Sequence, residues 1–348
     1  MHESAMTQHP VTVMNGNVSV MCAAPYDDDR IPLLVLYSAV LIVGLPANLT
    51  TICLTLIQVC RSNVLAVYLL SLSLCDFTYL LTLPVWAVYV SNGHHWPWSS
   101  LACQLTGYVF FTNMYISIFL LCCISLDRYV AVVYAVESRG LRQQRSAVII
   151  TLSICVLVGL GHAPVFSMPK GHATNEDHQC FEPSQSTDMI TGFNYARFGV
   201  GFLCPLTLLI FTNYTILTNV HASTGLQAQQ KQKVRLLIIA VVLLFLICFG
   251  PYHAVLLLRA VTYHFPSLQE DCHFERNVYT PYSISLGLST INSAVNPVLY
   301  VLSSDNIQKD IQSCVAGLRR RSSQHTTNYF SKSSDTNPRD QDIPRTSV

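Results

Sequence analysis

Three charged positions inside long apolar stretches are the parts of this sequence best suited to chemistry. Asp76 and Arg197 each interrupt a run of apolar and aromatic residues, and Asp127 stands beside Arg128 near the end of another run. A charge in an apolar medium is costly unless a counter-ion, water or protonation relieves it. Arginine offers a planar fork that can hold a carboxylate through two charge-assisted hydrogen bonds. We therefore predict that Arg197 faces a cavity or an anion, and that Asp76 belongs to a polar cluster.

The elements that position these residues are long apolar helices. The chain is 51% hydrophobic and 11% charged, whereas soluble domains have about 25% charged residues. Runs of about 20 apolar residues are long enough to cross a bilayer. The sequence contains seven such runs, at 31–59, 64–91, 101–133, 146–167, 193–220, 234–262 and 277–302. We predict an all-α membrane protein, a seven-transmembrane helix bundle in which prolines kink several helices.

The basic residues of the short connections predict the orientation. One set of connections carries Arg61, then Arg139, Arg142 and Arg145, then Lys231, Lys233 and Arg235, and then Lys309 and 319–321. This basic side should be cytoplasmic. We expect an extracellular N-terminal segment 1–30 without a cleaved signal peptide, the helical domain 31–303, a short amphipathic eighth helix 304–317 and a disordered tail 318–348.

Several short motifs lie in the right runs and in the right order for one receptor family. Asp127-Arg128-Tyr129 ends the third run, and Asn296-Pro297-Val298-Leu299-Tyr300 closes the seventh. Cys248-Phe249-Gly250-Pro251 lies in the sixth run and Gly44-Leu45-Pro46-Ala47-Asn48 in the first. Over residues 31–316 the chain resembles the rhodopsin-like family of G-protein-coupled receptors. It departs from the family pattern at Cys155, Phe249 and Asn213, so details of activation are expected to differ.

The resemblance implies roles for three groups of residues. Asp127 would hold Arg128 at rest, and Arg128, with Tyr129 and Tyr300, would form the switch toward the G protein. A sodium ion, or a proton, would be held at Asp76 by its neighbours Asn113, Ser117, Asn292 and Asn296, although a purely structural network is the alternative. Ile118, Pro205 and Phe245 would connect the ligand pocket to the cytoplasmic half, or simply pack the core.

A lipid acid is the expected ligand. Segments such as 71–76, 131–135 and 248–253 resemble the subgroup of proton-sensing and lysolipid-related receptors, and 195–198 is closest to a member linked to oxidised free fatty acids. Arg197 would bind the headgroup. The other candidate pocket residues, some of which could merely pack helices, are Tyr108, Phe111, Tyr115, Phe198, Phe249, Tyr252, His253 and Arg259.

Proton sensing is the alternative function. Nine of the twelve histidines fall at or near the predicted outside, and histidine titrates near physiological pH. The buried acids typical of the related proton sensors are depleted, because Asn296 and Val158 stand at two of their positions. A transporter, from a different class, would show repeated halves and more intramembrane charges. No enzyme motif is found, and the near-neutral charge gives no reason to expect nucleic acid.

Cysteines and surface motifs add further expectations. The predicted outside holds Cys22, Cys103, Cys180 and Cys272, which allow three pairings; the family favours Cys103–Cys180, which leaves Cys22–Cys272. Asn17 should be glycosylated, and Cys314 is either a free thiol or a palmitoylated anchor in contact with membrane lipids. The expected partners are a heterotrimeric G protein of the Gα13, Gq or Gi class and an arrestin that binds the phosphorylated tail. No cofactor is expected besides the sodium ion.

Overall fold

A computed structural model describes residues 13–14, 17–18, 25–134, 142–166, 180, 187–225, 227–265 and 272–303. The chain divides into two units, 1–300 and 301–348, and the long helices belong to the first. The predicted eighth helix 304–317 and tail 318–348 lie outside the described residues, as do Cys22 and Cys314.

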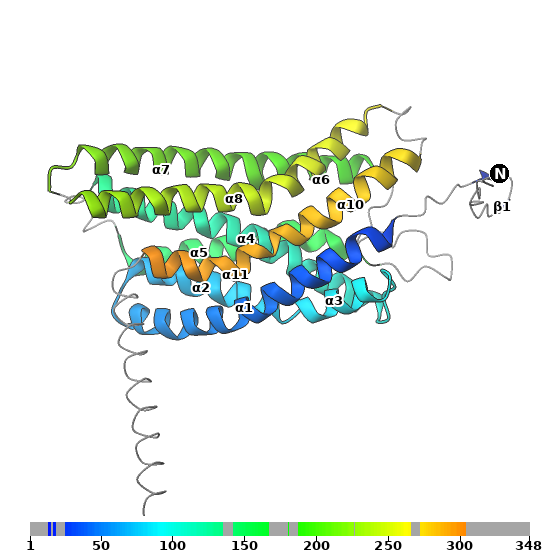
Figure 1. Ribbon diagram of the computed structural model, residues 1–348, viewed down its shortest axis with the longest axis horizontal. Coiled ribbons are helices and arrows are strands. Elements are labelled where there is room, and N and C mark those ends of the chain that lie inside the picture. Colours follow the sequence, from blue (N-terminus) through cyan, green and yellow to red (C-terminus); the bar gives the residue numbers. More distant parts are fainter. Residues whose placement is uncertain are drawn as a thin grey trace, which may run out of the picture. The chain divides into compact units, whose positions relative to one another are not determined.

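Long helices running side by side make up the first unit (Figure 1). Two-residue strands β1 (Val13–Met14) and β2 (Asn17–Val18), the latter containing the predicted glycosylation site, pair before the first helix. The helical elements are α1 (Tyr26–Cys60), α2 (Val64–Leu80), α3 (Leu83–Ser91), α4 (Ser100–Val133), α5 (Gln144–His162), η2 (Ala163–Phe166), α6 (Asp188–Phe198), η3 (Gly199–Leu203), α7 (Cys204–Ala222), α8 (Ala228–Thr262), α10 (Cys272–Ser289) and α11 (Ile291–Ser303).

Six helical segments among the described residues are long and apolar enough to cross a membrane. They are Tyr26–Cys60, Val64–Ser91, Ser100–Val133, Gln144–Phe166, Asp188–Ala222 and Ala228–Thr262. The seventh predicted run, 277–302, is folded as α10 and α11, which meet at Thr290. The prediction of an all-α membrane protein is confirmed, while α1 and α10 each begin five residues earlier than the apolar runs suggested.

Prolines lie at or near most of the interruptions. Proline lacks an N–H group and cannot donate the i→i−4 bond of a helix. The second span breaks at Leu81–Thr82 just before Pro84, and a π-helical turn, η3, immediately precedes Pro205. The break at Thr290 is of another kind, because the hydroxyls of Ser289 and Thr290 donate to backbone carbonyls one turn back. These breaks lie beside the buried polar residues of the bundle.

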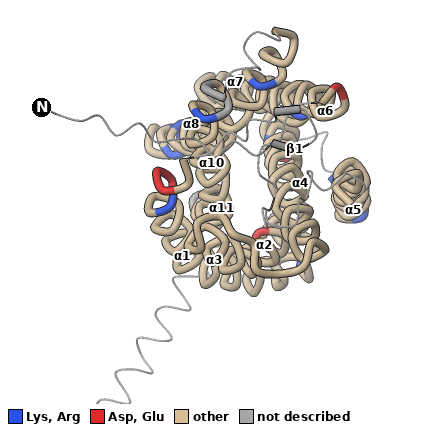
Figure 2. Tube along the Cα trace, turned by 90° about the vertical axis from the view of Figure 1, so that its right-hand side faces the viewer, with Lys and Arg blue, Asp and Glu red and all other residues tan. Residues whose placement is uncertain are grey.

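Charged residues are sparse along the helices, as the view of Figure 2 shows. Helix α4 packs against α2, α5 and α7, and α8 packs against α6, α7 and α10. The centre of the bundle is apolar and aromatic, with Leu72, Ile118 and Phe249 fully buried. Among the described residues few charged side chains are buried, and these, such as Asp29, Asp76 and Asp127, mark the candidate sites.

Candidate ligand and switch sites

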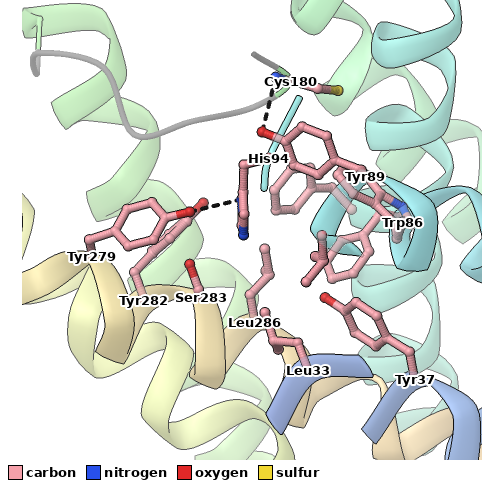
Figure 3. A pocket seen from close by; sticks show the side chains of 13 residues that line it. Leu33, Tyr37, Trp86, Tyr89, His94, Cys180, Tyr279, Tyr282, Ser283 and Leu286 are labelled. Carbon is pink, nitrogen blue, oxygen red and sulfur yellow. Dashed lines mark hydrogen bonds between the residues drawn. The ribbon is translucent and has the colours of Figure 1, made fainter. Parts of the chain in front are cut away.

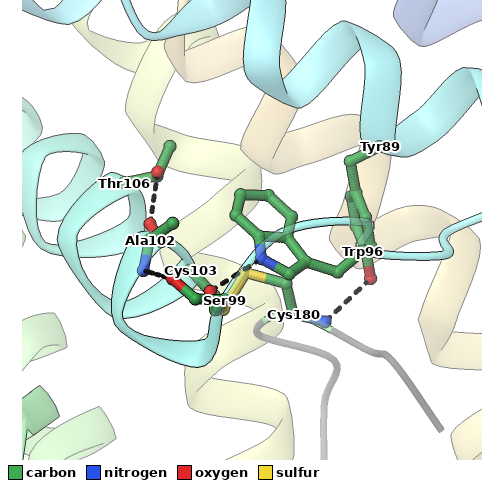
Figure 4. The surroundings of a disulfide bond; sticks show 7 residues. All are labelled: Tyr89, Trp96, Ser99, Ala102, Cys103, Thr106 and Cys180. Atoms are coloured by element: carbon green, nitrogen blue, oxygen red, sulfur yellow. Dashed lines mark hydrogen bonds between the residues drawn. A yellow bond between two sulfur atoms is a disulfide. The ribbon is translucent and has the colours of Figure 1, made fainter.

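A disulfide joins the start of α4 to a segment before α6. Cys103 is bonded to Cys180, as the sequence predicted, with their Cα atoms 5.7 Å apart. Two further bonds hold this region (Figure 4): the Cys180 amide donates to the Tyr89 hydroxyl at 3.2 Å, and the Trp96 indole donates to the Ser99 carbonyl at 3.1 Å. Since Cys22 lies outside the described residues, the pairing of Cys22 with Cys272 stays a prediction. We call this end of the bundle the disulfide end.

A cavity opens between α1, α3, α4 and α10 near the disulfide end (Figure 3). It encloses about 540 Å³, including space open to solvent. Its walls are mainly aromatic, and they include Trp86, Tyr89, Phe110, Phe111, Tyr279 and Tyr282. A wall of aromatic side chains with a few polar groups is typical of small-molecule sites.

Arg197 lies in the last turn of α6, within reach of this cavity's wall. Its guanidinium carbon is 4.8 Å from the centre of the Phe111 ring, which also lines the cavity. The hydroxyls of Tyr252, Tyr115 and Tyr282 are close enough to interact electrostatically with it. No ion pair joins Arg197 to a carboxylate in the part of the chain that the structure describes. The geometry therefore leaves its charge facing aromatic rings and hydroxyls.

His253 and Tyr115 form a hydrogen-bonded pair beside Arg197. The Nδ1 atom of His253 lies 2.7 Å from the Phe249 carbonyl oxygen, which can only accept, so Nδ1 carries the proton. In the neutral ring Nε2 is then the acceptor, and the Tyr115 hydroxyl donates to it at 3.1 Å. His162 of α5 stacks on the other side of Tyr115, with ring centres 5.1 Å apart. This arrangement fixes the Tyr115 ring between two histidines.

The remaining predicted pocket residues are divided between the site and its surroundings. Arg259 is buried, and its guanidinium lies 5.9 Å from the Tyr282 ring centre. Tyr108 instead donates to the Gly159 carbonyl of α5, and Phe198 packs on Phe202. Phe249 is fully buried beneath His253. The sequence pattern did not single out several aromatic residues of the cavity wall, namely Trp86, Tyr89, Phe110, Tyr279 and Tyr282. His162, which packs on Tyr115, was counted only among the outer histidines.

Asp76 is fully buried and collects four hydrogen bonds. Ser293 and Asn296 donate to its carboxylate at 2.8 Å each, Ser117 at 3.3 Å and Asn113 at 3.5 Å. Asn292 is buried nearby in sequence but makes no hydrogen bond to Asp76. Ser293 of α11, which the sequence analysis did not single out, donates to Asp76 where Asn292 was expected to.

The three predicted connector residues are all buried between the pocket and the other end of the bundle. Ile118 is fully buried, and Phe245 stacks on Phe202 with ring centres 5.7 Å apart. The Cys122 thiol donates to the Pro205 carbonyl at 3.8 Å. These contacts are those of a packed core, and the connector role stays a prediction.

At the opposite end of α4 the Asp127 carboxylate is paired with a residue from outside that helix. It accepts two bonds from Arg142, from Nε at 2.8 Å and from Nη2 at 2.6 Å, while its resting-state contact with Arg128 stays a prediction. Arg142 stands just before α5, beyond the segment 135–141, and the sequence pattern did not connect it with Asp127. Tyr129 packs on Tyr134 and Phe211, and the side chain of Tyr300 lies outside the described residues.

A second buried carboxylate lies at the disulfide end. Asp29 is fully buried in the first turn of α1, and one of its oxygens is 3.5 Å from Nε2 of His94. The Tyr279 hydroxyl and Nδ1 of His94 are 2.9 Å apart, and Tyr26 stacks on the same imidazole. The residues are far apart in the sequence, so no local pattern could have joined them.

The chain is similar in sequence to known proteins of one receptor family. Residues 47–300 match the family described as "7 transmembrane receptor (rhodopsin family)". The chain belongs to this family. It is 46% identical to "Probable G-protein coupled receptor 132" from Mus musculus, over 91% of this chain and 81% of that protein. The human protein of the same name is 44% identical, over 89% and 81%. "G-protein coupled receptor 68" from Bos taurus is 34% identical, over 85% and 80%.

Family membership settles the class of function. The receptor is a multi-pass plasma-membrane protein that recognises a ligand and couples to a G protein, and it is neither an enzyme nor a transporter. The predicted membership of the rhodopsin-like family and the seven-span fold are confirmed. The pair α10–α11 accordingly supplies the seventh span.

Proposed function

We propose that this receptor recognises an extracellular lipid acid, an oxidised free fatty acid or a related acyl anion, and activates a heterotrimeric G protein of the Gα13, Gq or Gi class. The disulfide end faces outward, since disulfides form in oxidising compartments. The observation that carries the proposal is Arg197, a cation among aromatic rings without a carboxylate partner in the described part of the chain. A carboxylate ligand would supply the missing counter-ion.

The shape of the site supports an acyl chain. Phe111 lies under the Arg197 guanidinium and also lines the aromatic cavity, and Tyr282 borders both. A chain whose carboxylate lies at Arg197 would therefore cross Phe111 and continue into apolar walls. The polar atoms along this path, such as the Ser283 hydroxyl, suit a chain that carries an oxygen substituent.

The test is ligand-stimulated nucleotide exchange in membranes that contain the receptor. The ligands tested are hydroxylated and unsubstituted fatty acids, acyl amino acids, lysophospholipids and the methyl ester of each acid. The potency of each ligand is measured with each class of G protein. We expect the free acids to act and the esters to be weak. Equal potency of acids and esters would contradict a carboxylate site.

A second candidate function, proton sensing, is favoured by the Asp29–His94 pair. A buried carboxylate favours a cation beside it, and protonation turns the 3.5 Å contact into an ion pair. Among the described residues, the groups that face the imidazole include Asp29 and Tyr26 of α1, Tyr89 of α3 and Tyr279 of α10. Acid would thus tighten the link between α1 and α10, and rising pH would loosen it.

His94→Phe is therefore expected to flatten the dependence of signalling on extracellular pH between about 5.5 and 8, where histidine titrates. Asp29→Asn should do the same, because it removes the counter-ion. His95→Phe is the matched control, since His95 is the exposed neighbour. G-protein activation is recorded across the pH series without added lipid. If His94→Phe keeps the full pH response, the Asp29–His94 pair is not the proton sensor.

The Asp76 cluster is proposed to hold a sodium ion. Its ligands would be the carboxylate, the Ser117 and Ser293 hydroxyls and the Asn113 amide oxygen, which is buried without a hydrogen bond. These are hard oxygen ligands of the kind that such cations prefer. Bound sodium would neutralise the carboxylate and hold α2, α4 and α11 together.

Sodium chloride is accordingly expected to lower agonist affinity in the wild type when compared with an organic-cation chloride of equal ionic strength. Asp76→Asn should abolish this difference, since the charge that binds the ion is gone. Agonist competition binding in the two salts measures it. If the effect of sodium on agonist affinity persists in Asp76→Asn, the Asp76 cluster is not the sodium site.

A further inference from the structure

We propose that Arg142 is a positioning residue for the G-protein switch: by occupying the Asp127 carboxylate, it weakens the restraint on Arg128 and raises the basal activity of the receptor. The proposal rests on the expected roles of Asp127 and Arg128 in coupling to the G protein. It adds a third member from outside α4 to that pair.

The ion pair has the geometry of a strong contact. Nε and Nη2 of Arg142 reach the two different oxygens of Asp127 at 2.8 and 2.6 Å, so the planar fork meets the carboxylate edge on. Such two-pronged pairs are the stronger form of the arginine–carboxylate interaction. The Asp127 side chain is 6% exposed and that of Arg142 is 32% exposed, so solvent screens the pair only in part.

Neighbouring contacts hold Arg142 in this place. Two residues later, the Gln144 side chain donates to the Val59 carbonyl at 3.1 Å, which ties the start of α5 to the end of α1. Tyr68 of α2 is buried close to both Asp127 and Arg142. Asp127 raises the pKa of Arg142, chiefly through the hydrogen bonds between them. The pair therefore joins α4 to a fixed point on its neighbours.

The consequence for Arg128 follows from the carboxylate. Asp127 has one negative charge, and the guanidinium of Arg142 neutralises it and takes a bond to each oxygen. A second cation is then held less tightly, because the charge that would attract it is already compensated. Arg128, the next residue along α4, is the cation expected to lose by this competition. Removing Arg142 would leave the whole charge of Asp127 to attract Arg128, which would favour the resting state.

The experiment measures basal nucleotide exchange without any ligand, normalised to the number of receptors at the cell surface. Arg142→Ala is expected to lower basal exchange about fivefold, the lower end of typical coupling between sites. Basal exchange of Arg142→Lys should lie between that of Arg142→Ala and that of the wild type, since lysine keeps the charge but loses the planar fork. Arg145→Ala, which removes an exposed arginine one turn later, should match the wild type.

The Asp127→Asn variant tests whether Arg142 acts through the Asp127 carboxylate. It should raise basal exchange, and adding Arg142→Ala to it should change nothing further, because the shared partner is gone. Arg142→Ala with wild-type exchange at normal surface number, beside an active Asp127→Asn, would overturn the role of Arg142 alone. The role of Arg142 would also be overturned if Arg142→Ala lowers basal exchange equally in the wild type and in Asp127→Asn. An Asp127→Asn receptor no more active than the wild type would instead overturn the switch on which the proposal rests.

Discussion

Arg197→Ala is expected to reduce the potency of a fatty-acid agonist about ten- to hundredfold. Hydrogen bonds to charged groups contribute about 1.5–3 kcal/mol, and each 1.4 kcal/mol changes an equilibrium constant about tenfold. The guanidinium stands over Phe111 beside the tyrosines, where water competes less than at a surface. Concentration–response curves for nucleotide exchange measure the shift.

The chemistry of the substitution can be separated from its effect on folding. Arg197→Lys should restore part of the potency, because an ammonium keeps the charge but loses the two-pronged geometry. The agonist methyl ester, already weak on the wild type, should lose little more on Arg197→Ala. Arg276→Ala, at an exposed position of α10, is the matched control. If acid and ester lose potency equally, Arg197 is structural and the anchor hypothesis is wrong.

Charged residues within apolar spans could be identified from the sequence. Most of the residues that contact them could not be identified in this way. Asp76 and Arg197 were recognised because a charge inside a span is expensive wherever it points. Ser293 was missed because a serine in a membrane helix carries no signal in the sequence that it lies beside Asp76. Tyr282 was missed for a similar reason, since one more aromatic residue in the seventh run carries no signal of its facing Arg197.

Pairs formed across the bundle depend on tertiary structure alone. Asp29 and His94 are brought together by α1 and the turn before α4, and the backbone of His94 adopts a φ of 61°, which few residues other than glycine accept. Asp127 and Arg142 are 15 residues apart, and no local sequence pattern pairs them. The family pattern predicts the neighbour Arg128 as the resting-state partner, and that contact stays a prediction. The sequence therefore located Asp127, but it gave no signal for the contact with Arg142.

The π-helical turn η3 gives a second large expected effect, at Gly201. A Cβ atom added there would overlap Cε1 of Tyr115 and lie 2.9 Å from Cδ1 of the same ring. The Tyr115 ring is 3% exposed, stacked against His162 and bonded to His253, so it cannot move aside without breaking those contacts. Gly201 therefore allows η3 to approach α4 at the pocket.

Gly201→Ala is expected to destabilise the receptor by about 1–3 kcal/mol, the usual cost of an extra methyl group in a packed interior. Displacing Tyr115 should also lower agonist affinity, because the ring borders the Arg197 site. Thermal inactivation of the solubilised receptor and agonist binding to membranes measure the two effects.

The control for Gly201→Ala is Gly199→Ala, which lies in the same turn and whose added Cβ would meet no atom within 4 Å. Since alanine is the better helix former, Gly199→Ala should be neutral or stabilising. Tyr115→Ala should relieve the clash, so the double variant with Gly201→Ala should lose less than the sum of the two single losses. Equal stability of Gly201→Ala and Gly199→Ala would show that Tyr115 can yield and that the close approach is not required.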